Sequence, residues 1–157
     1  MDRAAMVRSH VETLLEKLTG QPCLKPDAEG DYPVQFEQAV YYVRLLDVER
    51  PVVQVFAVAV AGAGERPELY AALNTINRQL RFARTFVTAG KVVFASELLG
   101  ETIDVDELAS ACGAVATAAD HFGPLIAKEY GGELPFHDTA VVGVEPAADA
   151  QGAGGYL

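Results

Sequence analysis

The sequence of 157 residues predicts one α+β domain, in which three helices pack on a twisted antiparallel sheet. Three segments carry apolar residues at the spacing of a helix, and five others show the alternating or continuous apolar runs of strands. The first three strand segments are joined by links too short for the crossovers that parallel strands need, and the last two by a tight turn. The expected order is therefore α-βββ-α-ββ-α.

A first helix is expected over residues 2–18. Its apolar side chains fall on one stripe, and Gly20 follows at a position where glycine commonly ends a helix. The stripe consists of Val7, Val11, Leu14, Leu15 and Leu18.

Three strands are expected next, over residues 32–36, 40–48 and 52–60. The first alternates apolar with polar residues, as a half-buried strand does, and the second is mixed, with Arg44 facing water. The third is nearly all apolar, which predicts a central strand covered on both faces. The short links between these strands favour an antiparallel meander.

A second helix is expected to begin near Pro67, a residue well suited to the first helical position. Its apolar seam consists of Leu69, Leu73, Ile76 and Leu80. Residues 82–88 and 91–98 then predict a hairpin. Gly90 can adopt the left-handed conformation that the turn requires, whereas Ala89 would resist it.

A third helix is expected to follow, because Asp104 and Glu107 have the spacing of a capping box. Pro124 is expected to kink this helix, or to end it and start a short second piece. Gly131 and Gly132 should end it finally. Its core face is expected to consist of Val105, Leu108, Cys112, Val115, Ala119 and Phe122.

The domain is expected to occupy residues 1–136, and the rest of the chain to be a tail. Residues 137–157 are acidic and rich in glycine and alanine, which predicts a flexible segment. Within it, residues 139–144 could pair as a short edge strand.

Composition excludes several classes of function. The chain is 50% hydrophobic and 22% charged, as globular domains are, and its net charge is −10. Such a surface repels the phosphates of nucleic acids and of anionic membranes, so neither is an expected partner. The N-terminus lacks the apolar run of a signal peptide, and the two cysteines suggest no disulfide framework. A cytoplasmic protein is therefore expected.

Two motifs resemble ligand sites but lack essential residues. Gly62-Ala63-Gly64 follows a strand and precedes a helix, as a dinucleotide-binding loop would, but Pro67 stands where the third glycine is needed. His10 and Cys23 partly match a zinc deaminase motif, but Pro26 replaces its second cysteine. We therefore expect no cofactor, no metal and no catalytic residues.

One basic cluster runs against the acidic composition. Arg78, Arg81 and Arg84 lie within seven residues, and Arg78 and Arg81 are expected to share a helix face. They could complement the helix dipole and form local ion pairs, or they could contact an anion or an acidic peptide. The three arginines are therefore the candidate partner contacts.

Residues 69–100 resemble the YbjN-like proteins, which belong with the type III secretion chaperone-like fold. The resemblance extends over roughly residues 6–130 and rests on structural motifs. It implies an α/β sandwich, frequent dimers, and binding of peptides or effectors rather than catalysis. The proline in the last helix and the acidic tail depart from the family pattern. The matching motifs are Leu73-Asn74-x-x-Asn77, a hairpin with Phe82, Phe86 and Gly90, and Glu97-Leu98-Leu99.

The leading hypothesis is a non-enzymatic chaperone-like or adaptor protein, which binds a segment of another protein along a sheet edge or an apolar groove. The alternatives are a small-ligand sensor or enzyme whose site no local motif reveals, and a structural oligomer subunit. A homodimer is expected, because sheet edges invite pairing and the alanine-rich residues 109–119 could approach a second copy closely.

Overall fold

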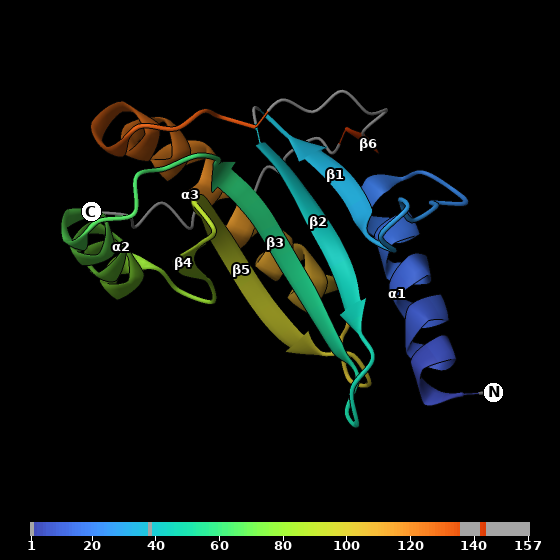
Figure 1. Cartoon of the computed structure of the whole chain (residues 1–157). Coiled ribbons are helices and arrows are strands. Elements are labelled where there is room, and N and C mark those ends of the chain that lie inside the picture. The colour runs from blue at the N-terminus through green and yellow to red at the C-terminus, as the bar shows by residue number, and fades with distance from the viewer. Residues whose placement is uncertain (1, 38, 136–141, 144–157) are drawn as a thin grey trace.

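The computed structural model describes residues 2–37, 39–135 and 142–143, and within them one sheet is packed against helices (Figure 1). The predicted order α-βββ-α-ββ-α is confirmed, and one short strand follows it. The elements are α1 (Arg3–Thr19), β1 (Tyr32–Phe36), β2 (Ala39–Leu46), β3 (Val52–Val60), α2 (Pro67–Gln79), β4 (Arg84–Thr88), β5 (Lys91–Leu99), α3 (Val105–Tyr130) and β6 (Val142–Gly143).

The sheet has the strand order β4-β5-β3-β2-β1-β6. The pairs β1–β2, β2–β3 and β4–β5 are antiparallel, as the short links predicted, and β3 and β5 are antiparallel as well. The last strand, β6, runs parallel to β1, with Val142 opposite Val34 and Gly143 opposite Gln35. It falls within residues 139–144, where an edge strand was expected, and the other residues of that segment lie outside the described residues.

The central strand β3 is covered on one face only. Val53, Val55 and Ala57 are fully buried beneath α3, whereas the alternate residues Phe56 and Val58 are half-buried. The prediction that both faces would be covered was therefore wrong. Figure 1 looks onto the side of the sheet that faces away from α3. We call this side the open sheet face; its residues include Tyr42, Arg44, Gln54, Phe56, Val58, Arg84, Phe86, Glu97 and Leu99.

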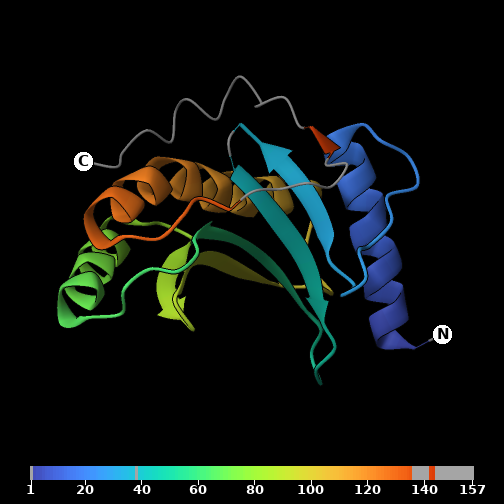
Figure 2. The same cartoon turned by 45° about the horizontal axis from the view of Figure 1, so that its top comes forward.

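Three helices border the core on the other side of the sheet. Figure 2 shows α3 lying along the sheet, with α1 beside the β1 end and α2 beside the β4 end. The predicted stripe of α1 is buried, except for the half-buried Leu18. Gly20 ends α1 in the left-handed conformation, with its N–H donating to the carbonyl of Glu16 at 2.9 Å. None of the helices that the structure describes combines the length and apolarity that a bilayer crossing requires.

The hairpin of β4 and β5 corrects one expectation about its turn. Ala89 and Gly90 form the turn together, and both have positive φ, 48° and 73°. The prediction that Ala89 would resist this conformation was wrong. A two-residue hairpin loop of this kind needs positive φ at both positions, and closing the hairpin in register outweighs the strain at Ala89.

The last helix, α3, begins at its predicted capping box and ends, as predicted, before Gly131. The Asp104 carboxylate accepts the N–H of Glu107 at 2.8 Å, and the Asp104 N–H donates to the Glu107 carboxylate at 3.0 Å. The helix runs through Pro124 to Tyr130, so of the two alternatives expected there, a kink or an end, the end is wrong. Pro124 is exposed, while the buried Phe122 and Ile126 on either side of it hold the helix against the sheet.

The alanine-rich side of α3 lies inside the protein. Ala111, Ala116, Ala118 and Ala119 are buried, so these four alanines are not available for contact with a second copy, whereas Gly113 and Ala114 are half-buried. Cys112 is buried among them as predicted, and burial raises the pKa of its thiol to about 12. This thiol therefore behaves as a small core residue rather than as a nucleophile.

Candidate interaction surface

Aromatic rings and arginines gather on the open sheet face. The rings of Tyr42 on β2 and Phe56 on β3 are stacked, with centroids 5.3 Å apart. The Arg44 guanidinium lies 4.6 Å from the centroid of the Phe56 ring. All three side chains are half-buried. Aromatic and arginine side chains are enriched in protein interfaces, because they bury a large area and also make directed polar contacts.

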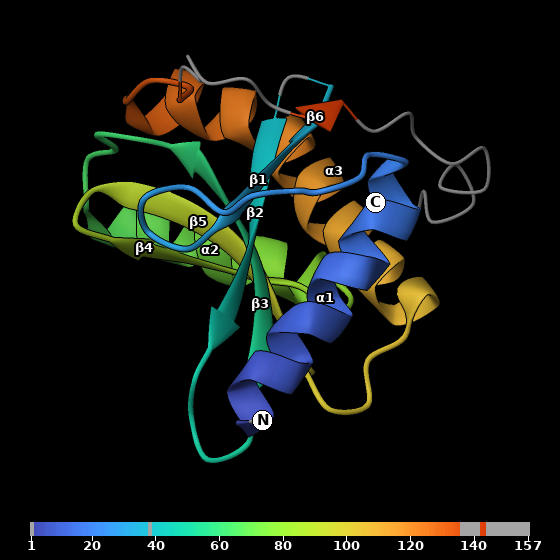
Figure 3. The ribbon, with the colours of Figure 1, turned by 90° about the vertical axis from the view of Figure 1, so that its right-hand side faces the viewer.

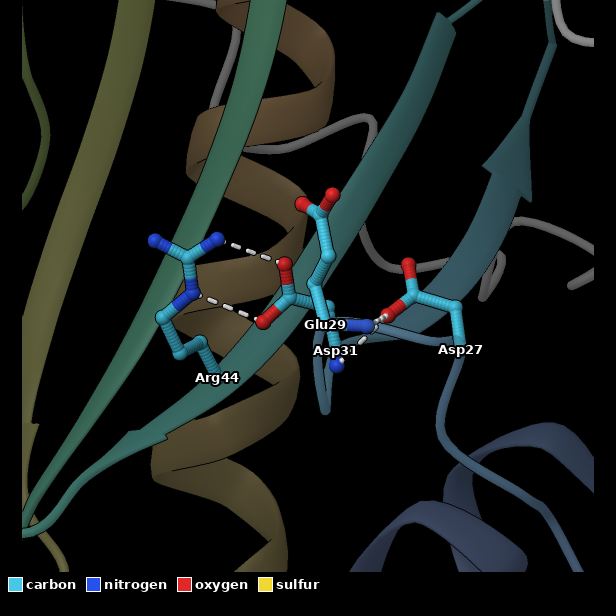
Figure 4. Close-up of polar contacts among 4 residues, drawn as sticks. All are labelled: Asp27, Glu29, Asp31 and Arg44. Atoms are coloured by element: carbon cyan, nitrogen blue, oxygen red, sulfur yellow. Dashed lines mark hydrogen bonds and ion pairs between the residues drawn. The ribbon is translucent and has the colours of Figure 1, made fainter.

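A buried carboxylate fixes the position of Arg44 (Figure 4). Asp31 is only 2% exposed, and its two carboxylate oxygens accept hydrogen bonds from Nε and Nη2 of Arg44 at 2.7 and 2.6 Å. These hydrogen bonds raise the pKa of Arg44 above its ordinary value. A forked pair of this kind holds the guanidinium in one orientation, and so keeps its face over Phe56.

The loop between α1 and β1 places Asp31 on this side of the sheet. Figure 3 shows the loop reaching to the side opposite α3. The Asp27 carboxylate accepts the backbone N–H groups of Glu29 and Asp31, both at 2.9 Å, which closes a tight turn. Burial, together with the negative charges of Asp27, Asp31 and Glu29, raises the pKa of Tyr42. The tyrosine hydroxyl therefore stays protonated beside this acidic loop.

A second polar group lies further along the open sheet face. Arg84 donates to both oxygens of Glu97, at 2.9 and 3.4 Å, and Gln54 donates to the same carboxylate at 2.9 Å. The hydrogen bonds from Arg84, and then from Gln54, lower the pKa of Glu97. Arg84 also lies 5.7 Å from the ring centroid of Phe86, which is 37% exposed. The face thus continues as a mixed aromatic and charged surface to the β4 edge.

The three candidate arginines surround the turn between α2 and β4. Because α2 ends at Gln79, Arg78 lies in its last turn and Arg81 lies beyond it. The prediction that these two share a helix face was therefore wrong. Arg84 is the first residue of β4, and all three arginines are exposed.

The glycine turn after β3 serves the fold. The Ala63 N–H donates to the carbonyl of Gly90 at 2.8 Å, and the Gly64 N–H donates to the carbonyl of Tyr130 at 3.3 Å. A phosphate-binding loop needs such donors to point at its ligand. Here they join the turn to the β4–β5 hairpin and to the end of α3.

Within residues 2–37, 39–135 and 142–143, titratable groups do not converge in a cavity. A groove of about 440 Å³ lies between α1 and the turn after β5, where the His10 ring contacts the carbonyl of Ile103 at 2.8 Å. Burial raises the pKa values of Tyr41 and Cys112, which lie in the core, and of Tyr32. The Tyr32 hydroxyl donates a hydrogen bond to the Glu12 carboxylate. Among the described residues, no group of three or more His, Cys, Asp or Glu side chains could hold a metal ion.

Three solved structures share this fold. A chain of the ExsC–ExsE complex has a TM-score of 0.61 and 23% identity, over 80% of this chain and 97% of that one. A chain of the HopA1–SchA chaperone–effector complex has a TM-score of 0.59 and 12% identity, over 79% of this chain and 98% of that chain. A chain from the structure of the Yersinia pestis type III secretion chaperone SycH in complex with a YscM2 fragment has a TM-score of 0.50 and 19% identity. The match covers 73% of this chain and 98% of that chain. The fold is therefore that of the type III secretion chaperones.

The family follows from the sequence itself. Residues 5–138 match the family model described as T3SS (YopN, CesT) and YbjN peptide-binding chaperone 1. The chain therefore belongs to this family of peptide-binding chaperones, TY-Chap1, which confirms the resemblance found in the sequence. No curated protein sequence matches the chain at a significant level.

Of the three candidate arginines, only Arg84 lies on the open sheet face, and sequence reasoning missed the aromatic part of that face. Tyr42 was assigned to a mixed strand and Phe56 to a strand covered on both faces, and the contact between Arg44 and Asp31 was not expected. A usable signal was present, since Arg44 and Gln54 interrupt two otherwise apolar strands and stand opposite each other in register. Polar residues at paired positions indicate a face that no helix covers.

Proposed function

We propose that this chain binds an extended segment of another protein on its open sheet face, and acts as a chaperone or adaptor without a catalytic step. The observation that carries this proposal is the uncovered surface formed by Tyr42, Arg44 and Phe56. Membership of a peptide-binding family supports it. The similar chains come from complexes of a chaperone with a second protein, by their own descriptions. We place the protein in the cytoplasm, where the free thiols of Cys23 and Cys112 would stay reduced.

The outer edge of β1 is the place where an extended segment would add to the sheet. Within the described residues, this edge is paired at two positions, by Val142 and Gly143. Strand addition uses backbone hydrogen bonds, so it tolerates many partner sequences, while side-chain contacts on the neighbouring face provide selectivity. In our proposal a partner segment replaces β6 beside β1 and continues across Tyr42 and Phe56.

Affinity capture from the native cytoplasm, followed by identification of the co-purifying chains, tests the proposal. We expect Phe56→Ala to reduce the recovery of the main co-purifying protein, because the substitution removes the centre of the aromatic surface. Leu125→Ala is the matched control, since Leu125 is 56% exposed on α3, on the other side of the sheet. Equal recovery with both variants, when both remain folded by circular dichroism, would contradict the proposal.

A chain that ends at residue 136 adds a second variant to the same experiment. We propose that residues 1–136 form the complete domain, so this truncation should change the free energy of unfolding by less than about 0.5 kcal/mol. Because it also removes β6, we expect recovery of the partner at least equal to that of the full chain. A clear loss of stability would show that the tail is part of the folded domain.

We also propose that the protein is a homodimer. The β4 edge is not paired by any described strand, and Phe86 beside it is partly exposed. Unprotected edges of this kind favour association. Light scattering coupled to gel filtration should give twice the chain mass of 16.7 kDa. A single species at the chain mass, at micromolar concentration, would exclude the dimer.

A further inference from the structure

The most exposed large apolar side chain of the described residues stands on a strained backbone. Phe82, in the turn between α2 and β4, is 84% exposed and has φ of 60°. A bulky aromatic residue at positive φ is a genuine outlier, and such strain persists only where the surrounding structure enforces it. Exposure gains nothing for folding at this position, so the strain and the exposure together indicate a contact with another molecule.

Both ends of the turn are held firmly. On the α2 side, the Leu80 N–H donates to the carbonyl of Ile76 at 3.1 Å. On the β4 side, the Asn77 side chain donates to the Thr85 carbonyl at 2.9 Å and accepts the Thr85 N–H at 2.8 Å. The Thr85 hydroxyl is itself buried and donates to the carbonyl of Val93 at 2.9 Å. Residues 80–83 are therefore presented on a rigid support, with the Phe82 ring in solvent.

Phe82 lies within a basic stretch of the sequence, although the chain has a net charge of −10. Arg78, Arg81 and Arg84 flank Phe82 in the sequence, and all three are exposed. Within the described part of the chain, ion pairs are found for Arg84 but not for Arg78 or Arg81. An exposed aromatic ring beside guanidinium groups suits an apolar residue that has carboxylates on both sides, because arginine pairs with carboxylates in a forked geometry.

We propose that residues 78–84 form a second contact for the partner segment, which docks there through an aromatic or aliphatic residue flanked by acidic residues. This inference rests on the proposed function and specifies the chemistry of the partner. The distance is compatible with one continuous segment. Four strand spacings separate β1 from β4, or about 19 Å, which about six residues of extended chain can span.

Binding of two labelled peptides of about ten residues, enough to cover this distance, tests the inference by fluorescence anisotropy. One peptide carries a central Asp-Phe-Asp triplet and the other carries Lys-Phe-Lys. We expect the full-length protein to bind the acidic peptide more tightly, and higher salt to weaken that binding. We expect Phe82→Gly to weaken it about tenfold, which is typical for loss of an anchoring aromatic side chain.

The same variant separates a binding role from a structural one. Glycine adopts positive φ without strain, so Phe82→Gly should melt at a temperature no lower than that of the unmodified protein. Arg81→Ala should also weaken binding of the acidic peptide. Arg50→Ala, which removes an exposed charge next to the turn between β2 and β3, should leave that binding unchanged.

Several results would overturn the inference. A lower melting temperature for Phe82→Gly would make Phe82 a structural residue. Unchanged affinity, or equal binding of the two peptides, would show that the turn does not select acidic partners. A variant that became monomeric while still binding the peptide would assign the turn to a dimer interface. In each of these cases the proposed function would still be supported if Phe56→Ala reduced the recovery of the partner in affinity capture. A protein that captured no partner at all would contradict both proposals.

Discussion

Phe94→Ala is expected to lower the free energy of unfolding by about 3–5 kcal/mol. Phe94 is fully buried on β5, and its ring is stacked on that of Phe122 from α3, with centroids 6.0 Å apart. Ala57, its neighbour in register on β3, is too small to fill the space that the substitution leaves. Urea denaturation followed by circular dichroism measures the loss.

Phe86→Ala is the matched control for this prediction. Phe86 lies on the adjacent strand β4, but its side chain points to the open sheet face and is 37% exposed. Its removal should therefore lower the free energy of unfolding by less than about 1 kcal/mol, because the Phe86 side chain is already partly in water. Similar losses for the two variants would mean that the contact between α3 and β5 is not the centre of the core.

Local sequence patterns were sufficient to predict the elements of this fold. Helix boundaries followed from Gly20, Pro67 and the pair of Asp104 and Glu107, each of which acts through its own backbone or its nearest neighbours. The positive φ of Ala89 and the absence of a helix end at Pro124 could not be predicted from local preferences of about 1–3 kcal/mol. At Ala89 the pairing of β4 with β5 outweighs the preference, and at Pro124 the packing of Phe122 and Ile126 outweighs it.

The open face of β3 was mispredicted because the surface that we propose binds a partner is itself largely apolar. Phe56 and Val58 on the open sheet face make β3 read as a strand buried on both sides. A binding surface of this kind breaks the usual rule that polar residues alternate with apolar ones on a half-exposed strand. The mistaken prediction therefore falls on residues that we assign to the proposed interaction surface.

The contact between Asp31 and Arg44 could not be predicted for a different reason. The two residues are 13 positions apart, and they meet because the turn at Asp27 directs one carboxylate across the first strand pair. The sequence shows a turn in this loop, but it does not show which way its side chains point. Only the strand register and the path of the loop bring the carboxylate to the guanidinium.

This contact leads to the last prediction, a loss of about 3 kcal/mol in the free energy of unfolding for Arg44→Met. Methionine keeps much of the side-chain volume over Phe56, but it leaves the buried Asp31 carboxylate without its two hydrogen bonds. The Arg44 side chain is 37% exposed, so water can enter and partly replace it. For that reason we expect the lower end of the range that is usual for a broken buried ion pair.

A double-mutant cycle distinguishes the lost pair from lost packing. If the cost arises from the uncompensated carboxylate, Asp31→Asn combined with Arg44→Met should be more stable than Arg44→Met alone, because the asparagine carries no charge into the buried site. The exposed pair of Arg84 and Glu97 serves as the comparison, and Arg84→Met should cost less than about 1 kcal/mol. If the double variant were no more stable than Arg44→Met, the loss would come from packing over Phe56, and the buried carboxylate would not be what fixes the arginine on the open sheet face.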